Sequence, residues 1–350
     1  MLRVAVYTIC LNEEHFADRW AESVKHADFA FVADTGSTDN TIARLDQHRI
    51  PAQRINVRPW RFDDARNAAL ALLPADFDVV ISLDMDETLT ANWREIIEQN
   101  WHGTRLKYGY VWSWLGDRPN VVFLSDKIAG RFTHRWHHPV HEILVPTVPE
   151  VVCTTQDIVI EHHPDGEKSR GHYLDLLILA VKEDPTDDRS AHYLGREYYF
   201  HRRYADAIAE FTRHLALPRA TWVPERASSM RYIAKCQDAQ GDRTAAYQWY
   251  LRAALEDSSR ESWVEAARFC LSQNAFHATL DFCERALASG ATIDTYMAER
   301  YANDEGPYDL AAVAHFHLGN RDKAIALAEE AVRRNPVDGR LCSNLATMIE

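Results

Sequence analysis

The sequence predicts an α/β domain with a Rossmann-like mixed sheet over residues 1–168, followed by an all-helical repeat domain over residues 169–350. In the first half, short apolar runs rich in β-branched residues alternate with polar turns and helical patterns, as in parallel βαβ units. From about Ser169 the strand-like runs stop and apolar residues recur at helical spacing. A length of 350 residues also favours two domains.

The composition argues against some classes of partner. The chain has 52 acidic and 39 basic residues, and the formal net charge of −13 disfavours duplex nucleic acid as the main partner. Its six cysteines are scattered without a CxxC pair, as is typical of thiols in a reducing compartment. We find no signal peptide and no apolar run long enough to span a bilayer. We therefore expect a cytoplasmic protein.

Strand, polar turn and helix follow one another twice at the start of the chain. Residues 2–10 and 29–33 are apolar and β-branched, which predicts two strands. A polar turn follows each of them, at residues 11–14 and at the Gly-, Ser- and Asp-rich segment 34–41, and a helical pattern begins there. This alternation predicts parallel strands that are connected by helices.

Asp34 and Arg66 are polar residues at ends of predicted elements. We predict a third strand at residues 55–57 and a helix at 61–73. Asp34, at a strand end, either binds a nucleoside hydroxyl or is an ordinary turn residue before glycine. Arg66 either pairs with a carboxylate or phosphate, or lies on the helix surface. Neither GxGxxG nor GxxxxGK[ST] occurs, so neither a dinucleotide fold nor a P-loop is predicted.

The most informative segment is the apolar run 78–83, which precedes the carboxylates Asp84, Asp86 and Glu87. It predicts a buried strand whose carboxyl end lies where open α/β sheets bind ligands. Three clustered negative charges repel one another unless a cation or ligand neutralises them. A hard cation that is shared with a diphosphate would do so. The alternative is a solvated helix start, with Asp86 as N-cap and Glu87 in the first turn.

Four motifs occur in order over the first hundred residues. They are Thr-Ile-Cys-Leu-Asn-Glu-Glu at 8–14, Asp-Thr-Gly-Ser-Thr-Asp-Asn-Thr at 34–41, Phe-Asp-Asp-Ala-Arg-Asn at 62–67 and Leu-Asp-Met-Asp-Glu at 83–87. Together they resemble the family-2 glycosyltransferases of the GT-A fold. The resemblance implies that the first two motifs hold the nucleotide of a nucleotide-diphosphate sugar, with a UDP-sugar expected, and that the Asp-x-Asp motif carries metal and ribose. The resemblance implies these nucleotide-sugar-binding residues: Thr8, Cys10, Asn12, Glu14, Asp34, Arg66, Asp84 and Met85.

A dense run of cationic and imidazole groups at residues 131–142 contains the candidate base. Glycosyl transfer with inversion needs a group that takes the acceptor proton. Glu142 is our candidate and His141 its rival, and the Val-His-Glu element also resembles this glycosyltransferase subgroup. The structural alternative is an ion pair between Glu142 and a neighbouring arginine such as Arg131. Lys127 and Arg131 are further cations that would hold the diphosphate or the acceptor.

Residues 157–163 predict a last strand that ends in histidines. GT-A enzymes often place a histidine there as a third metal ligand, beside residues that correspond to Asp84 and Asp86. His162 is preferred over His163 because it shares a face with the apolar residues of the strand. We expect Mn²⁺ or Mg²⁺ as cofactor, and imidazole is the better ligand for Mn²⁺.

The second half resembles a tetratricopeptide repeat array. Leu194-Gly195-x-x-Tyr198, then Ala207, Phe211 and Pro218, match the repeat pattern. The small residue recurs at Ala246, Ala278 and Ala324, at intervals that scatter around the roughly 34 residues of that repeat. This predicts a solenoid of helix pairs.

The helical repeats suggest two roles. They either form a concave surface for a peptide or a second copy of this chain, giving a homo-oligomer, or they only support the enzyme domain. Five histidines of this half are interpreted as groove or surface residues, because no pair has a metalloprotease context: His192, His201, His214, His315 and His317.

The sequence therefore predicts an inverting, metal-dependent glycosyltransferase that moves a sugar from a nucleotide-diphosphate sugar to a hydroxyl or similar nucleophile. A peptide or protein acceptor is suggested by the repeats, and glycans, small molecules and modified DNA bases stay open. The alternative is a catalytically inactive GT-A-like scaffold that carries a protein-binding repeat module.

Overall fold

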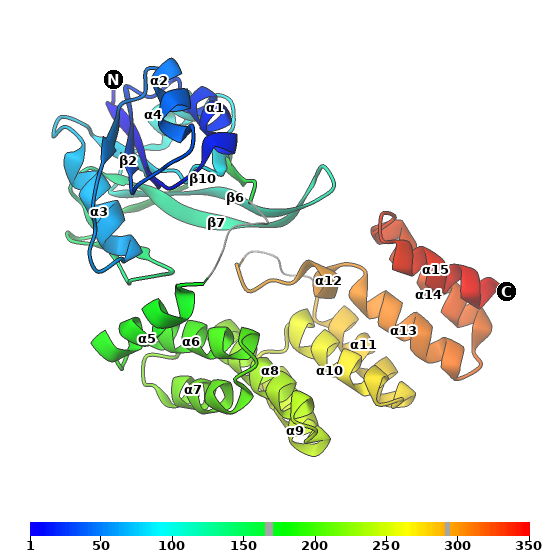
Figure 1. The fold of residues 1–350 in the computed structure, drawn as a ribbon. Helices are drawn as coiled ribbons and strands as arrows, with labels where there is room; N and C mark the ends of the chain where they lie inside the picture. The colour runs from blue at the N-terminus through cyan, green and yellow to red at the C-terminus, as the bar shows by residue number, and fades with distance from the viewer. Residues whose placement is uncertain (165–170, 291–294) are drawn as a thin grey trace. The chain divides into compact units, whose positions relative to one another are not determined.

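The computed structural model describes residues 1–164, 171–290 and 295–350. The chain divides into two compact units, Met1–Ala180 and Val181–Glu350. The first is an α/β unit and the second is all-helical, which confirms the predicted fold classes (Figure 1). The predicted boundary between residues 168 and 169 lies outside the described residues. None of the helices in the described ranges has the length and apolar character needed to span a bilayer.

A mixed sheet is the centre of the first unit (Figure 1). Within the described residues its strands are β1 (Val4–Cys10), β2 (Phe29–Asp34), β3 (Ala52–Arg54), β4 (Val79–Ser82), β5 (Glu87–Leu89), β6 (Arg105–Leu115), β7 (Arg118–Gly130) and β10 (Val152–His162). They are arranged in the order β3-β2-β1-β4-β7-β6-β10-β5. β1 to β4 run parallel, and the other half contains antiparallel pairs. β8 (His134–His137) and β9 (Ile143–Pro146) form a separate hairpin.

Alternate residues of β1 enter two different hydrophobic cores. Val4 and Val6 pack in a core with Trp20, whereas Ala5 and Tyr7 pack in a second core with residues of the helix 62–72. Because successive strand residues point to opposite faces, helices cover both faces of the sheet. The helices of this unit before residue 150 are α1 (Glu14–Ser23), α2 (Thr41–Gln47), α3 (Phe62–Leu72) and α4 (Trp93–Asn100).

One predicted element, and the alternative interpretation of the acidic segment, differ from the structure. The third strand, predicted at residues 55–57, is wrong, because the pairing of Val32 with Ala52 places β3 earlier in the chain. Glu87 does not lie in the first turn of a helix. It begins β5, and its backbone pairs with His162 at the end of β10. Pairing between distant segments decided both cases, and a local pattern does not report it.

The second unit consists of consecutive helix pairs, as predicted (Figure 1). The pairs are α6–α7, α8–α9, α10–α11 and α13–α14. α5 begins before the unit boundary, α12 is a single turn, and α15 follows the last pair. The bounds are α5 (Tyr173–Glu183), α6 (Asp188–Phe200), α7 (Tyr204–Ala216), α8 (Val223–Ala239), α9 (Arg243–Glu256), α10 (Arg260–Ser272), α11 (Phe276–Ala288), α12 (Arg300–Asn303), α13 (Gly306–His317), α14 (Arg321–Arg334) and α15 (Gly339–Ile349).

Small residues allow the paired helices to approach one another. Ala207, Ala246 and Ala324 are buried on α7, α9 and α14, the second helices of their pairs. A Cβ atom at Gly195 of α6 would lie 2.7 Å from the ring of Phe211 on α7. The predicted repeat positions are therefore positions where helices are in close contact.

Two histidines that were expected in a groove or on the surface are in the interior. His192 and His214 are fully buried, so that interpretation was wrong for both. The hydroxyl of Ser229 lies between them, 2.8 Å from His192 Nδ1 and 3.0 Å from His214 Nδ1. A hydrogen-bond partner inside the helices offsets the free-energy cost of burying an imidazole.

Candidate functional site

Acidic side chains gather at the carboxyl ends of neighbouring parallel strands. Asp34 is the last residue of β2, and its backbone pairs with Cys10 at the end of β1. Asp84 and Asp86 follow directly after β4, which is the neighbour of β1 on its other side. In open α/β sheets this edge binds ligands.

The first two motifs form adjoining loops at this edge. Asn12 Oδ1 accepts a hydrogen bond from the Thr38 amide at 2.7 Å, and Glu14 Oε2 accepts one from the Asn40 amide at 3.0 Å. Asn12 has a positive φ of 55°, a conformation that asparagine adopts more readily than most residues. These two side chains thus hold the second motif's backbone in place.

The carboxylate of Asp34 is fixed at the junction of these loops. Its Oδ1 accepts a hydrogen bond from the Ser37 amide at 2.8 Å and lies 3.6 Å from Cys10 Sγ. Burial opposes ionisation of Asp34, but hydrogen bonds from Ser37 outweigh it, so the pKa of Asp34 is lowered. Burial, with the charge of Asp34, raises the pKa of the Cys10 thiol to about 12. The site therefore presents an ionised carboxylate beside a neutral thiol.

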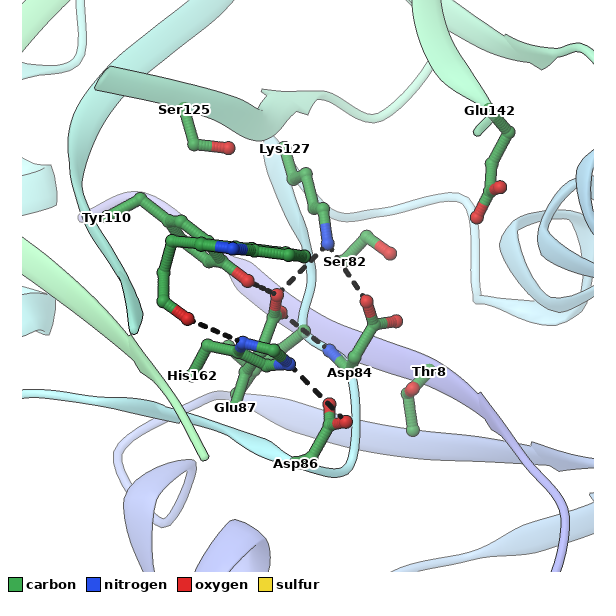
Figure 2. Close-up of polar contacts among 12 residues, drawn as sticks. Thr8, Ser82, Asp84, Asp86, Glu87, Tyr110, Ser125, Lys127, Glu142 and His162 are labelled. Atoms are coloured by element: carbon green, nitrogen blue, oxygen red, sulfur yellow. Dashed lines mark hydrogen bonds and ion pairs between the residues drawn. The ribbon is translucent and has the colours of Figure 1, made fainter. Parts of the chain in front are cut away.

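Asp84 lies between two cations, Arg66 and Lys127. Figure 2 shows its contact with Lys127. Its Oδ1 is 2.7 Å from Arg66 Nη1 and its Oδ2 is 2.9 Å from Lys127 Nζ. Lys127 is also 3.1 Å from Glu87 Oε1, which accepts a hydrogen bond from the Tyr110 hydroxyl at 2.6 Å. Burial alone would raise the pKa of Asp84, but Arg66 and Lys127 hold it far below its ordinary value. In the same way the carboxylates outweigh burial and raise the pKa of Lys127.

Asp86 faces His162 from β10 (Figure 2). His162 Nε2 lies 3.6 Å from Asp86 Oδ2, and His162 Nδ1 lies 2.9 Å from the carbonyl oxygen of Trp112. Burial lowers the pKa of His162, but Asp86 and the Trp112 carbonyl outweigh it, so the pKa is raised. When Nδ1–H donates to that carbonyl, the neutral ring presents its Nε2 lone pair towards Asp86.

Asp86 and His162 are the side chains here that could hold a divalent cation. Two groups bound to one ion at about 2.1 Å lie roughly 3.0–3.4 Å apart, depending on the angle at the ion. The observed 3.6 Å between Asp86 Oδ2 and His162 Nε2 is slightly longer than that range. His163 has different surroundings, with Nε2 at 3.6 Å from Glu161 and its ring stacked on Trp114 at 5.4 Å. Of the two candidate histidines, His162 is the one whose imidazole lies beside the Asp86 carboxylate.

Glu142 is bound to Arg66 of α3. Arg66 Nε donates to Glu142 Oε1 while the same guanidinium holds Asp84. Burial would lower the pKa of Arg66, but the two carboxylates raise it well above its ordinary value. Glu142 is thus in an ion pair, as the structural alternative anticipated, although with Arg66 and not with Arg131. Figure 2 shows Glu142 set apart from Asp86 and His162.

Some residues that the resemblance assigned to the site have side chains in the packing around it. Met85 is buried in the hydrophobic core, and Thr8 is fully buried on β1. Arg131 donates to the carbonyl oxygens of Leu73 at 2.7 Å and Pro74 at 3.1 Å, just beyond the end of α3. His141, the rival base, is half-buried and has a positive φ of 52°.

Sequence reasoning missed the roles of several residues here. Glu87 was read as a member of the acidic cluster, whereas its contacts with Lys127 and Tyr110 stabilise the loop after β4. Trp112 contacts His162 in two ways: its ring stacks on the imidazole with the centroids 4.8 Å apart, and its carbonyl oxygen lies 2.9 Å from His162 Nδ1. An open pocket beside this region includes Arg19. Burial lowers the pKa of Arg19, and the charge of Asp86 only partly opposes this. The available signal was the recurrence of an aromatic residue at every second position of β6, from Tyr108 to Trp114.

No family model matches this chain. Its N-terminal part is similar to the lipopolysaccharide core biosynthesis glycosyltransferase LpsC of Rhizobium meliloti (strain 1021), with 29% identity over 161 residues. The N-terminal unit resembles a glycosyltransferase. The match covers 41% of this chain and 58% of LpsC, so the chain spans less than two thirds of that relative's length.

Solved structures resemble about half of the chain. Yeast Tom70 has 16% identity, a TM-score of 0.42, and coverage of 52% of this chain and 36% of Tom70. A TPR repeat-containing protein from Cytophaga hutchinsonii has 12% identity and a TM-score of 0.40, and the match covers 50% of this chain and 63% of that protein. Pseudomonas aeruginosa pilF has 13% identity and a TM-score of 0.38, and the match covers 49% of this chain and 72% of pilF. At these TM-scores the likenesses carry no conclusion about function.

Proposed function

We propose that this protein is an inverting, metal-dependent glycosyltransferase. It would move a sugar from a nucleotide-diphosphate sugar, with a UDP-sugar as the expected donor, to a hydroxyl or similar nucleophile. One observation carries the proposal: Asp86 Oδ2 and His162 Nε2 lie 3.6 Å apart at the ligand-binding edge of a sheet. The similarity of the N-terminal part to LpsC supports glycosyl transfer as the reaction class.

Asp86 and His162 would hold Mn²⁺ or Mg²⁺, and oxygens of the diphosphate would complete the shell. When bound, the ion offsets the negative charge that develops on the leaving diphosphate. Lys127 contacts both Asp84 and Glu87. It would therefore stay paired with Glu87 if it left Asp84. If Lys127 donates to the diphosphate instead, an oxygen of Asp84 becomes available to the ribose or the ion.

Glu142 would take the proton from the acceptor nucleophile, with His141 as the rival base. Arg66 orients Glu142 through a hydrogen bond to Oε1. The same guanidinium holds Asp84, so the proposed base and the Asp-x-Asp motif keep a fixed separation. Such fixed positioning of a base relative to the donor is what proton transfer in the transition state requires.

The test is a donor screen that measures release of the nucleotide diphosphate, with and without EDTA. We expect release from one donor, its loss in EDTA and its return with Mn²⁺. Asp86→Asn should abolish turnover, and His163→Gln is the matched control because its ring faces Glu161. Near wild-type release by Asp86→Asn would refute the metal assignment.

A second candidate function, an inactive scaffold, is favoured by one observation. In this structure protein cations contact both Asp84 and Glu142, so those carboxylates are already neutralised. A thermal-shift measurement separates the two functions. An increase in Tm with UDP plus Mn²⁺ that exceeds the increase with Mn²⁺ alone supports the enzyme. No shift with any nucleotide diphosphate supports the scaffold.

A further inference from the structure

Three consecutive helices of the second unit bring metal-ligating groups together. Asp188 is the first residue of α6, His214 lies in the last turn of α7, and Glu225 lies in the first turn of α8. One ligand atom of each lies within 4.8 Å of the other two. His214 is fully buried, Glu225 is buried, and Asp188 is half-buried.

The distance between His214 and Glu225 fits coordination better than hydrogen bonding. His214 Nε2 lies 3.4 Å from Glu225 Oε1 and has no hydrogen-bond partner among the described residues. A charge-assisted hydrogen bond would be about 2.7–2.9 Å long. Two ligands at about 2.0–2.1 Å from a tetrahedral ion are separated by about 3.4 Å. An ion bound between this buried nitrogen and the carboxylate oxygen would therefore satisfy both groups.

The other ring nitrogen of His214 is held by a hydrogen-bonded chain. Ser229 Oγ lies 3.0 Å from His214 Nδ1 and 2.8 Å from His192 Nδ1. A hydroxyl has one proton to donate, so it donates to one ring and accepts from the other. If Ser229 accepts from His214 Nδ1–H, the Nε2 lone pair faces Glu225, as in a metal ligand whose second nitrogen is fixed by a hydrogen bond.

We propose that Asp188, His214 and Glu225 bind a divalent transition-metal ion of the Zn²⁺ class. One imidazole and two carboxylates suit such an ion, and three protein ligands leave a fourth position for water. The partial exposure of Asp188 gives the ion a way in. Because each ligand comes from a different helix, the ion would fasten α6, α7 and α8 to one another. This site is independent of the proposed glycosyl transfer.

A metal-free explanation exists for the same residues. Carboxylates at the N-terminal ends of α6 and α8, and a histidine at the C-terminal end of α7, each complement the helix dipole. Tyr296 donates to Glu225 Oε2 at 3.1 Å, and Arg189 in turn donates to Tyr296, which brings a positive charge near the cluster. The experiment must therefore detect the ion itself.

The experiment uses the full chain with Asp86→Asn, which removes the candidate metal site of the first unit. After dialysis against EDTA and removal of the chelator, the protein is titrated with Co²⁺ and followed by visible absorption. We expect one bound equivalent with the intense bands of a tetrahedral ion, and displacement of Co²⁺ by one equivalent of Zn²⁺. Adding Asp188→Asn or Glu225→Gln should weaken binding at least tenfold.

The matched control is His201→Gln in the same background. His201 forms a similar pair with Glu197, at 3.7 Å, but its side chain is 47% exposed, so its loss should not change the titration. Zn²⁺ should also raise the Tm of the control variant by more than it raises that of Asp188→Asn. The half-buried Asp188 should be replaceable without unfolding, and circular dichroism checks this. No stoichiometric binding, or binding that survives the Asp188 and Glu225 changes, overturns the proposal.

Discussion

Arg66 donates its Nε–H to Oε1 of Glu142, a residue 76 positions later in the chain. The same guanidinium is 2.7 Å from Asp84 Oδ1, and its face packs over the ring of Trp136. One buried cation thus joins the proposed base to the Asp-x-Asp motif. The proposed catalysis therefore involves Arg66 together with the carboxylates.

The identity of the base can be tested with two neutral variants. Glu142→Gln keeps the size of the side chain and removes the basic oxygen, so we expect kcat to fall by about 10²–10⁴-fold. Binding of the nucleotide diphosphate should change little. His141→Gln is the comparison, and it should retain most of the activity. If His141→Gln shows the large loss and Glu142→Gln does not, the roles are reversed.

Removing the buried cation should destabilise the first unit. Arg66→Leu leaves Asp84 and Glu142 without this partner, and breaking a buried ion pair in this way costs about 3–5 kcal/mol. Urea unfolding followed by tryptophan fluorescence measures the change. Arg44→Leu is the control, because the Arg44–Asp18 pair is exposed and should contribute less than about 1 kcal/mol. Equal midpoint shifts in the two variants would contradict this expectation.

The two adjacent histidines should differ in their effect on metal binding. His162→Gln removes the imidazole beside Asp86, so the affinity for Mn²⁺ should fall by tenfold or more. His163→Gln should leave it unchanged, because that ring is stacked on Trp114. Calorimetric titration of the two variants with Mn²⁺ provides the measurement. A larger loss of Mn²⁺ affinity in His163→Gln than in His162→Gln would show that His163, and not His162, is the metal ligand.

The stability of the second unit should decrease in mild acid because of His192. Burial lowers the pKa of His192 well below its ordinary value near 6.5. Below about pH 6.5, His192 of the unfolded chain binds a proton that His192 of the folded chain does not bind. The free energy of unfolding therefore falls as the pH drops. The slope from one such group is at most about 1.4 kcal/mol per pH unit, and above pH 6.5 the contribution is constant.

Denaturant unfolding between pH 7.5 and pH 5, in EDTA, checks this dependence. His192→Gln should show a shallower decrease below about pH 6.5 than the wild type, because it lacks the titrating group. The starting stability of the variant does not matter, since the slopes are compared. Parallel curves would show that His192 does not supply the pH dependence.

Adding a side chain at Gly195 should lower the stability of the second unit. Gly195→Ala places a methyl group 2.7 Å from the Phe211 ring, and such overpacking typically costs about 1–3 kcal/mol. Gly339→Ala is a matched control near the start of α15, where no atom lies within 4 Å of the added methyl group. It should be neutral or stabilise by up to about 1 kcal/mol. Thermal unfolding of both variants tests this, and a stabilised Gly195→Ala would contradict the close packing of α6 on α7.

The sequence by itself determined most of the elements and the position of the acidic cluster. Strand and helix periodicity are local properties, so the parallel strands, the helix pairs and the strand-end location of Asp34 and Asp84 were predictable. The small residues at Gly195 and Ala207 marked helix contacts for the same reason. The metal ion, the donor and the acceptor stay predictions.

The tertiary structure decided which distant groups meet. The register of β10 against β5 pairs His162 with Glu87, and it is the side chain of His162 that faces the Asp86 carboxylate. His163 contacts Asp86 through its backbone amide, which donates to the Asp86 carbonyl oxygen at 2.8 Å. The contact of Arg66 with Glu142 depends on how the segment after β8 packs against α3. Contacts of this kind depend on strand register and on the burial of one element against another, and residue spacing along the chain reports neither.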